Sequence, residues 1–396
     1  MRFALALPPQ QQIFAAFFTY AACIGSLYPR LPDIQKNMAV GEGALGGALI
    51  GIAAGTLLSL TFGGRFAAKF DARMIILTFI PALSVLFALA SSASSPLLFF
   101  VLLVPVGLNM GMLELVLNLE ADRVENLVGR RIMNRCHAFW SFGFFTAGLV
   151  SAGFAQTGLP PTLQLCLMVP VICAVTAILL STIQPAPPRV TVHEEQAAPL
   201  FAFPTFGILV LVTVSASAMV LEGAGADWSA IYMRKEFDVS PFLSGFAAAA
   251  GAGSQAFFRF FADGFVERYS PVKVARVMLC ILMAGVLAVL LAPGAVFALA
   301  GFFLMGVGTS VLFPLAMSAA AQRTDRSAAV NVAALAQITF VLFLLAPPLL
   351  GFVAEHIGIR WAFGACLPIV AVSLLATGAL GIKQAKGDDG GGEQRA

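Results

Sequence analysis

The sequence predicts an all-α membrane protein whose twelve transmembrane helices form two pseudo-symmetric bundles of six. First, 59% of the 396 residues are hydrophobic and only 11% are charged, against roughly 25% charged in a soluble domain. Second, the mean hydropathy of +0.92 is more than a soluble core can bury. Third, long apolar stretches such as residues 74–90 approach the roughly 20 residues that a helix needs to cross a bilayer. We therefore expect spanning helices rather than a barrel.

A short basic motif occurs once in each half of the chain. In the first copy, residues 62–73 read FGGRFAAKFDAR. Aligning it with the second copy places Phe62 on Phe261, and Lys69 on Arg268. Each copy follows an apolar stretch of helical length and precedes another. Such internal symmetry is typical of transporter folds, so the two halves are predicted to be related.

Charge clusters and runs of Pro, Gly and Ser divide the chain into its spans. The first six are expected at residues 11–30, 43–62, 73–92, 97–119, 136–156 and 162–183. The second six are expected at residues 205–226, 241–262, 273–292, 294–320, 328–353 and 358–381. The polar, Pro-containing stretch between them is typical of a linker, and the last residues are typical of a disordered tail. The predicted domains are a bundle at 1–183, a linker at 184–204, a bundle at 205–382 and a tail at 383–396.

The distribution of Lys and Arg predicts the orientation. Eighteen of the 23 basic residues fall at the ends and loops that share a side with the linker. The other side holds only Arg30, Lys36, Arg234, Lys235 and Arg360. Basic residues accumulate in cytoplasmic loops, so both termini and the linker are predicted to face the cytoplasm. For a bacterial chain this is the inner membrane.

Several functional classes are excluded by what the sequence lacks. It contains no phosphate-binding GKS/T loop, no H-E-x-x-H motif and no nucleophile elbow, so no enzyme is expected. Three widely separated histidines do not indicate a metal site. A net charge of +3 is too small to indicate nucleic acid binding. No cofactor is expected, and energy for transport would have to come from an ion gradient.

Six spans plus six, a central linker and a basic loop after spans 2 and 8 resemble the major facilitator superfamily. More specific stretches resemble its bacterial MosC and YbjJ-like branch: SLYPRLP at 26–32, ELVLN at 114–118, HAFWS at 137–141, EGAGADW at 222–228, RFFAD at 259–263 and PPLLG at 347–351. The resemblance implies a secondary transporter that moves a small polar molecule by alternating access, with proton-coupled export. MosC-like proteins are associated with an inositol-derived rhizopine, so a sugar-, cyclitol- or drug-like substrate is implied.

The resemblance also implies a cytoplasmic gate in the two basic loops. The family motif is G-x-x-x-D-R-x-G-R-R/K, and the first copy departs from it because Ala68 replaces the acid and Asp71 the second glycine. In the second copy Glu267 occupies the acidic position. The implied gating residues are Lys69, Arg73, Arg259, Asp263, Glu267 and Arg268. The alternative is that these are solvated loop charges.

Glu114 is the first candidate for substrate binding or proton coupling. Asn118 lies one helical turn later, so both side chains point the same way. A charged group at mid-depth in a membrane is costly and usually faces a cavity or carries protons. Alternatively, Glu114 lies near the cytoplasmic helix end and pairs with Arg123 or Arg135.

Glu222, Asp227 and Trp228 form a second candidate group, placed near the outer end of span 7. Gly223 and Gly225 between them would allow the helix to unwind and expose backbone groups to a ligand. Trp228 could stack on a ring. The alternative is an interfacial aromatic residue with two solvated acids at a helix end.

Other polar residues complete the predicted site. His137 and Trp140 share one face of span 5 by their spacing, and His137 could relay protons or pack as a hydrogen-bonding residue. Arg30 could attract an anionic substrate, lock the outer gate through an acid, or simply reach the interface. The uncharged polar residues inside spans are cavity-lining candidates or interhelical hydrogen-bond partners: Gln164, Gln255, Asn331 and Gln337.

Two other functions remain open at this point. One is a sensor or scaffold that kept a transporter fold without flux, and the other is a facilitator without coupling. The expected partners are a small-molecule substrate, protons and the lipid bilayer, with no nucleic acid. The chain is expected to act as a monomer.

Overall fold

The computed structural model describes residues 7–67, 69–130, 132–187 and 202–381. All regular secondary structure in these ranges is helical. The predicted tail at 383–396 and linker residues 188–201 lie outside the described residues.

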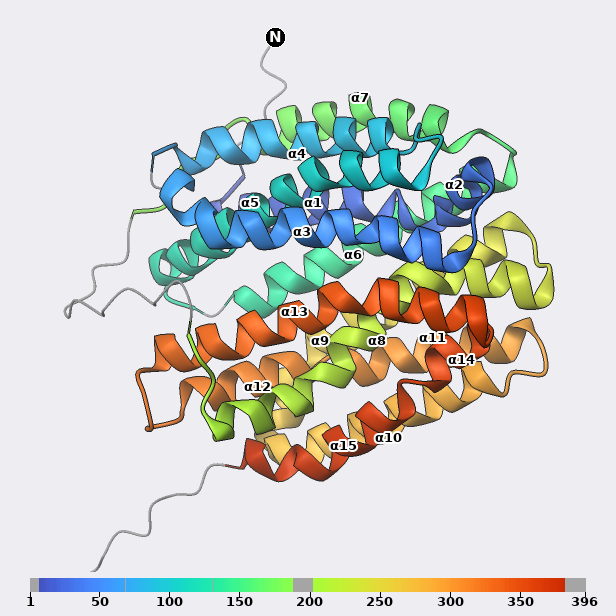
Figure 1. Cartoon of the computed structure of the whole chain (residues 1–396). Coiled ribbons are helices and arrows are strands. Elements are labelled where there is room, and N and C mark those ends of the chain that lie inside the picture. Colours follow the sequence, from blue (N-terminus) through green and yellow to red (C-terminus); the bar gives the residue numbers. More distant parts are fainter. Residues whose placement is uncertain (1–6, 68, 131, 188–201, 382–396) are drawn as a thin grey trace, which may run out of the picture.

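The first half of the chain forms one layer of helices and the second half forms another, stacked against it (Figure 1). The first layer contains α1 (Pro9–Gly25), η1 (Tyr28–Arg30), α2 (Leu31–Met38), α3 (Glu42–Ala67), α4 (Ala72–Ala90), α5 (Pro96–Val128), α6 (Met133–Gln156) and α7 (Pro161–Leu180). The second contains α8 (Phe206–Phe237), α9 (Pro241–Tyr269), α10 (Pro271–Leu290), α11 (Ala295–Thr309), α12 (Leu312–Ala321), α13 (Ala328–His356), α14 (Ile359–Gly364), α15 (Leu367–Ala376) and η2 (Thr377–Leu380).

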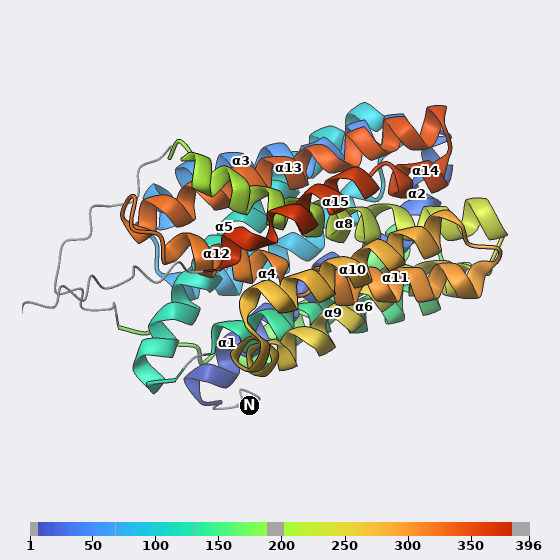
Figure 2. The same cartoon turned by 90° about the horizontal axis from the view of Figure 1, so that it is seen from below.

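Each of the twelve predicted spans coincides with a helix or with helices broken by a turn. The span expected at 294–320 is α11 followed by α12, and that at 358–381 is α14, α15 and η2. Ten helical stretches in the described part of the chain are long and apolar enough to cross a membrane. Helices α1 and α9 are outside that set but run alongside the others (Figure 2). The all-α membrane fold is confirmed.

Side chains that satisfy free backbone N–H groups fix where several helices begin. Ser95 accepts a hydrogen bond from the Leu98 N–H at the start of α5, and Ser240 accepts one from the Leu243 N–H at the start of α9. Proline follows each of these caps, where its missing N–H costs nothing. These signals set where α5 and α9 begin.

The two halves meet along two helix pairs, α3 with α13 and α6 with α9, and small residues permit the close approach. A Cβ atom on Gly46 of α3 would lie 2.7 Å from the carbonyl oxygen of Pro347 in α13. A Cβ on Gly245 of α9 would lie 2.7 Å from the Cβ of Ala152 in α6. The helices of the two halves therefore approach closely at both points, and Gly46 faces the backbone of α13.

Candidate functional site

The two ends of the bundle differ in how the halves meet. We call the end where α5 and α9 finish the basic end, because the repeated basic motif lies there. The opposite end holds η1, α2 and the α8–α9 turn. A cavity lies between the halves toward the basic end, and ionic contacts join them at the opposite end.

The large cavity has a volume of about 610 Å³. Helices α3, α5 and α6 of the first half and α9, α12 and α13 of the second half contribute to its wall. It extends to the basic end, since its lining includes Met133, the first residue of α6, and Val266, close to the end of α9. Among its lining residues are the predicted site residues Glu114, Asn118, His137 and Arg259.

Glu114 and Asn118 lie together in the cavity wall as their spacing predicts. The Asn118 amide donates to the Glu114 carboxylate at 3.1 Å and to the Glu114 backbone carbonyl at 2.8 Å. The Tyr20 hydroxyl also interacts with this carboxylate. Arg123, one of the two alternative partners, instead pairs with Glu120 at 2.5 Å. No ion pair to Glu114 forms among the described residues, so its hydrogen-bond partners there are neutral.

Arg259 lies inside the protein and not with the exposed charges of the loop. Its guanidinium donates to the Ser310 carbonyl at 3.0 Å and to Glu222 at 3.3 Å. A longer contact of 3.4 Å reaches the Ser141 hydroxyl on α6, in the other half. This placement differs from the one expected for a gating residue in the cytoplasmic loop, because α9 points this side chain into the cavity.

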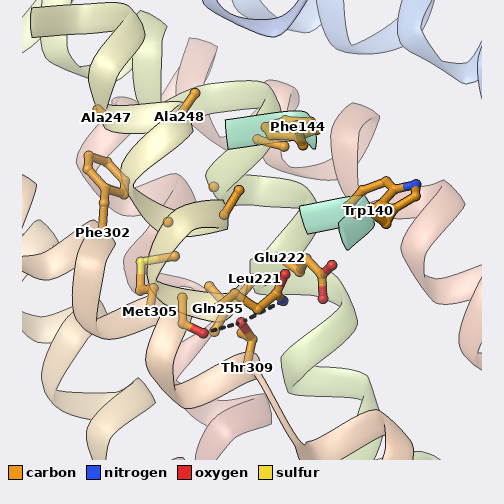
Figure 3. A pocket seen from close by; sticks show the side chains of 15 residues that line it. Trp140, Phe144, Leu221, Glu222, Ala247, Ala248, Gln255, Phe302, Met305 and Thr309 are labelled. Carbon is orange, nitrogen blue, oxygen red and sulfur yellow. Dashed lines mark hydrogen bonds between the residues drawn. The ribbon is translucent and has the colours of Figure 1, made fainter. Parts of the chain in front are cut away.

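A small pocket of about 60 Å³ lies next to the Arg259–Glu222 pair. Figure 3 shows Trp140 and Phe144 of α6 on one side, with Phe302 and Met305 of α11 on the other. Gln255 also lines this pocket and donates to the Thr309 hydroxyl at 3.2 Å. Three predicted site residues therefore come together here: Trp140, Glu222 and Gln255.

Helix α8 does not unwind at Gly223 and Gly225, so that prediction is wrong. The helix is continuous from Phe206 to Phe237, which places Glu222 at mid-helix rather than near an end. Trp228 is fully buried, and Asp227 is only 7% exposed. The interfacial alternative is therefore also wrong for these two. The Trp228 indole N–H has no partner within the described part of the chain.

The opposite end is held by ionic contacts that cross between the halves. Asp33 accepts from Arg30 at 2.8 Å within its own half and from Arg234 at 2.5 Å in the other half. Lys235 pairs with Glu42 at 2.8 Å, again across the halves. Arg30 is almost completely buried and also donates to Gln164 at 3.1 Å. Arg30 therefore pairs with an acid, Asp33, at this end. This is the arrangement that a lock of the outer gate through an acid would need.

Backbone groups add two further contacts between the halves at the opposite end. Glu355 at the end of α13 accepts a hydrogen bond from the Gly43 N–H of α3 at 2.7 Å. Gln156 at the end of α6 accepts one from the Phe242 N–H of α9 at 3.1 Å. Sequence reasoning missed Asp33, Glu42, Lys235 and Glu355, because nothing in a single sequence shows which helix ends meet.

Two predicted cavity residues lie elsewhere. Asn331 donates to Asp325 at 3.0 Å, and Gln337 accepts from the Ala202 N–H at 3.1 Å. Both contacts tie the start of α13 to nearby segments at the basic end. Neither residue lines either cavity.

The remaining predicted gating residues lie at the basic end but are not brought together by the described contacts. Arg73 donates to the Ser181 carbonyl at 2.6 Å, within the first half. Lys69 and Glu267 are exposed, and the Arg268 guanidinium lies 5.4 Å from the centre of the Tyr269 ring. The side chain of Asp263 lies outside what the structure describes.

Comparison with known proteins decides the family. The family model described as Major Facilitator Superfamily matches residues 13–343, with a second match at 212–391. The chain belongs to the major facilitator superfamily. It is therefore a multi-pass membrane transporter and not an enzyme. This confirms the resemblance that the sequence motifs carry.

Curated relatives of this superfamily member extend over nearly its whole length. An uncharacterized transporter, y4wD of Sinorhizobium fredii, is 27% identical over 366 residues, which cover 90% of this chain and 94% of that protein. The membrane protein MosC of Rhizobium meliloti is 25% identical and covers 91% and 86% respectively. The MosC-like branch predicted from the motifs is thus supported by similarity along the chain.

Solved structures show the same fold at low identity. A bacterial homologue of the lysosomal transporter Spinster, in an inward-facing and occupied conformation, has a TM-score of 0.72 at 13% identity and covers 94% of this chain and 96% of its own. The nucleoside transporter NupG has a TM-score of 0.67 at 14% identity, with coverage of 94% and 98%. These likenesses concern the superfamily fold alone.

Proposed function

We propose that the protein is a secondary active transporter that exports a small organic molecule in exchange for protons by alternating access. The observation that carries the proposal is the asymmetry of the two ends. The large cavity extends to the basic end, whereas the opposite end is joined by Asp33–Arg234 and Glu42–Lys235 pairs across the halves. If the basic end faces the cytoplasm, the structure corresponds to an inward-facing state.

Glu114 is the residue proposed to carry the proton. Its carboxyl group lies in the cavity wall with neutral hydrogen-bond partners, so a change in protonation leaves no buried cation unpaired. Acidic groups within membrane spans commonly serve as proton carriers. When the cavity faces each side in turn, the same carboxyl group can bind a proton on one side and release it on the other.

The Arg259–Glu222 pair is proposed to form the inner limit of the substrate site. Arg259 lines the large cavity and Glu222 lines the small pocket, so the pair lies between the two. The cavity is complete within one chain, which supports a monomer. We further propose a bacterial inner-membrane location with both termini in the cytoplasm, and Lys69, Arg73, Asp263, Glu267 and Arg268 as charges that gate the basic end.

The substrate class at this level is a small organic molecule that is sugar-, cyclitol- or drug-like. The cyclitol in this class comes from the resemblance of the sequence motifs to MosC-like proteins. The fucose:proton symporter FucP has a related fold, with a TM-score of 0.59 at 17% identity. This supports only that the fold is compatible with sugar and proton transport.

Proteoliposomes with an entrapped pH dye test the proposal. Under an imposed pH gradient, adding myo-inositol, glucose, glucosamine or dansylcadaverine should move protons with at least one of them, and Glu114→Gln should abolish this movement. Asp238→Asn is the matched control, because Asp238 is exposed and has a positive φ of 46° that Asn tolerates. Uptake without proton movement would indicate an uncoupled facilitator, and binding without uptake a sensor.

A further inference from the structure

Different helices contribute polar and apolar side chains to the wall of the large cavity. The first half contributes Glu114, Asn118, Asp122 and His137 of α5 and α6, beside apolar residues, and the second half contributes Arg259 and Ser310. The lining residues of α12 and α13 are all apolar: Phe313, Pro314, Leu315, Met317, Ala336 and Phe340. A ligand that fills the cavity must therefore present a polar end to α5 and an apolar body to α12 and α13.

The charge available to a ligand in this wall is negative. Arg259, the cation in the described wall, is already occupied by the Glu222 carboxylate and the Ser310 carbonyl. The Glu114 carboxylate receives its hydrogen bond from a neutral group, the Asn118 amide, at 3.1 Å. His137 also faces the cavity, and an ordinary histidine is mostly neutral at pH 7. Glu114 is therefore a carboxylate without a cationic partner in the described protein.

The α12 and α13 side of the wall does not match a polyol. Every hydroxyl of a sugar or cyclitol gives up hydrogen bonds to water on entering a site, and each one left without a partner is unfavourable. The α12 and α13 side offers hydrocarbon and aromatic surfaces instead. Apolar surface favours a ligand body that is itself apolar. The volume of about 610 Å³ falls within the range of roughly 300–1,000 Å³ typical of sites for drug-sized ligands.

We propose that the transported substrate is an amphipathic amine. Its ammonium group binds the Glu114 carboxylate beside Asn118, and its apolar body packs against Phe313 and Phe340. The proposal rests on the proposed transport function and narrows it. Glu114 is neutral when it holds a proton and negatively charged when it binds the ammonium group. Binding of the substrate therefore favours release of the proton, and binding of the proton favours release of the substrate.

Binding to the purified full-length chain in detergent tests the substrate class without requiring flux. The probe is dansylcadaverine, a fluorescent primary amine with an aromatic body, and its N-acetyl derivative is the matched neutral analogue. Charge-assisted contacts are stronger than neutral ones, so the amine is expected to bind about tenfold more tightly than the acetylated form at pH 7.5. Glucosamine and myo-inositol are expected not to displace it.

Substitutions in the cavity wall test where the probe binds. Glu114→Gln should remove the preference for the amine over its acetylated form, and Phe340→Ser should weaken both, while Asp238→Asn should change neither. Equal binding of the two probes to the wild-type chain would overturn the proposal, and this comparison needs no variant to fold. Displacement by myo-inositol at equal concentration would also overturn it.

The outcomes separate this proposal from the transport function. If dansylcadaverine binds as expected but moves no protons in proteoliposomes, the ligand class stands and transport fails. If myo-inositol moves protons and dansylcadaverine does not bind, transport stands and the ligand class fails.

Discussion

Asp33 and Asp227 are two acidic residues with different surroundings. Asp33 accepts hydrogen bonds from Arg30 and Arg234. Asp227 is 7% exposed and forms no hydrogen bond within the described residues. A carboxylate that pairs with two guanidinium groups stabilises them, whereas a buried carboxyl without a partner is costly when charged. The same Asp→Asn change should therefore have different effects at the two positions.

Asp33→Asn should loosen the opposite end. It removes the negative charge between Arg30 and Arg234, and hydrogen bonds to charged groups contribute about 2 kcal/mol. Hydrogen exchange followed by mass spectrometry should show faster exchange in residues 28–45 of the variant. Unchanged exchange there would show that Asp33 does not hold the halves together.

Asp227→Asn should leave the melting temperature in detergent unchanged or raise it. The amide replaces a buried carboxyl that has no described partner, so no ion pair is broken. A thermal melt beside Asp33→Asn provides the internal comparison. A larger drop in melting temperature for Asp227→Asn than for Asp33→Asn would show that Asp227 has a stabilising partner after all.

At the level of the elements, Gly46 is one of the glycines that allow α3 and α13 to approach each other closely. A Cβ on Gly46 would lie 2.7 Å from the Pro347 carbonyl oxygen, whereas one on the neighbouring Gly47 would meet nothing within 4 Å. Alanine favours a helix over glycine by about 1 kcal/mol at both positions. The difference between the two variants therefore reports the contact alone.

Gly46→Ala should lower the melting temperature relative to Gly47→Ala and reduce transport. The added methyl group forces α3 away from α13 at the opposite end, because the nearest atoms are backbone and cannot rotate aside. A thermal melt and the proteoliposome assay on both variants measure this. Equal behaviour of the two would show that the close approach is not needed.

The helices were predictable from sequence as apolar spans, but their full lengths were not. Helix α5 continues to Val128 and α8 to Phe237, beyond the expected ends at 119 and 226. Apolarity marks the part of a helix in contact with lipid, while the helix itself continues into charged sequence. Asn118 beside Glu114 was predictable from helical spacing. The Arg259–Glu222 pair was not, since it joins different helices.

For the whole molecule, alternating access requires that the two halves tilt against each other about the central cavity. The contacts that join the halves at the opposite end are mainly ionic or involve helix termini. Such contacts can break and reform with modest changes in free energy.

Pulsed electron paramagnetic resonance in proteoliposomes tests this central claim most directly. In a variant lacking the six native cysteines, one spin-label pair at Leu127→Cys and Tyr269→Cys would report the basic end. A second pair at Thr157→Cys and Ile357→Cys would report the opposite end. On changing the pH or adding substrate, the account predicts that the first distance shortens as the second lengthens. Distances that stay fixed, or that change in the same direction at both ends, would contradict it.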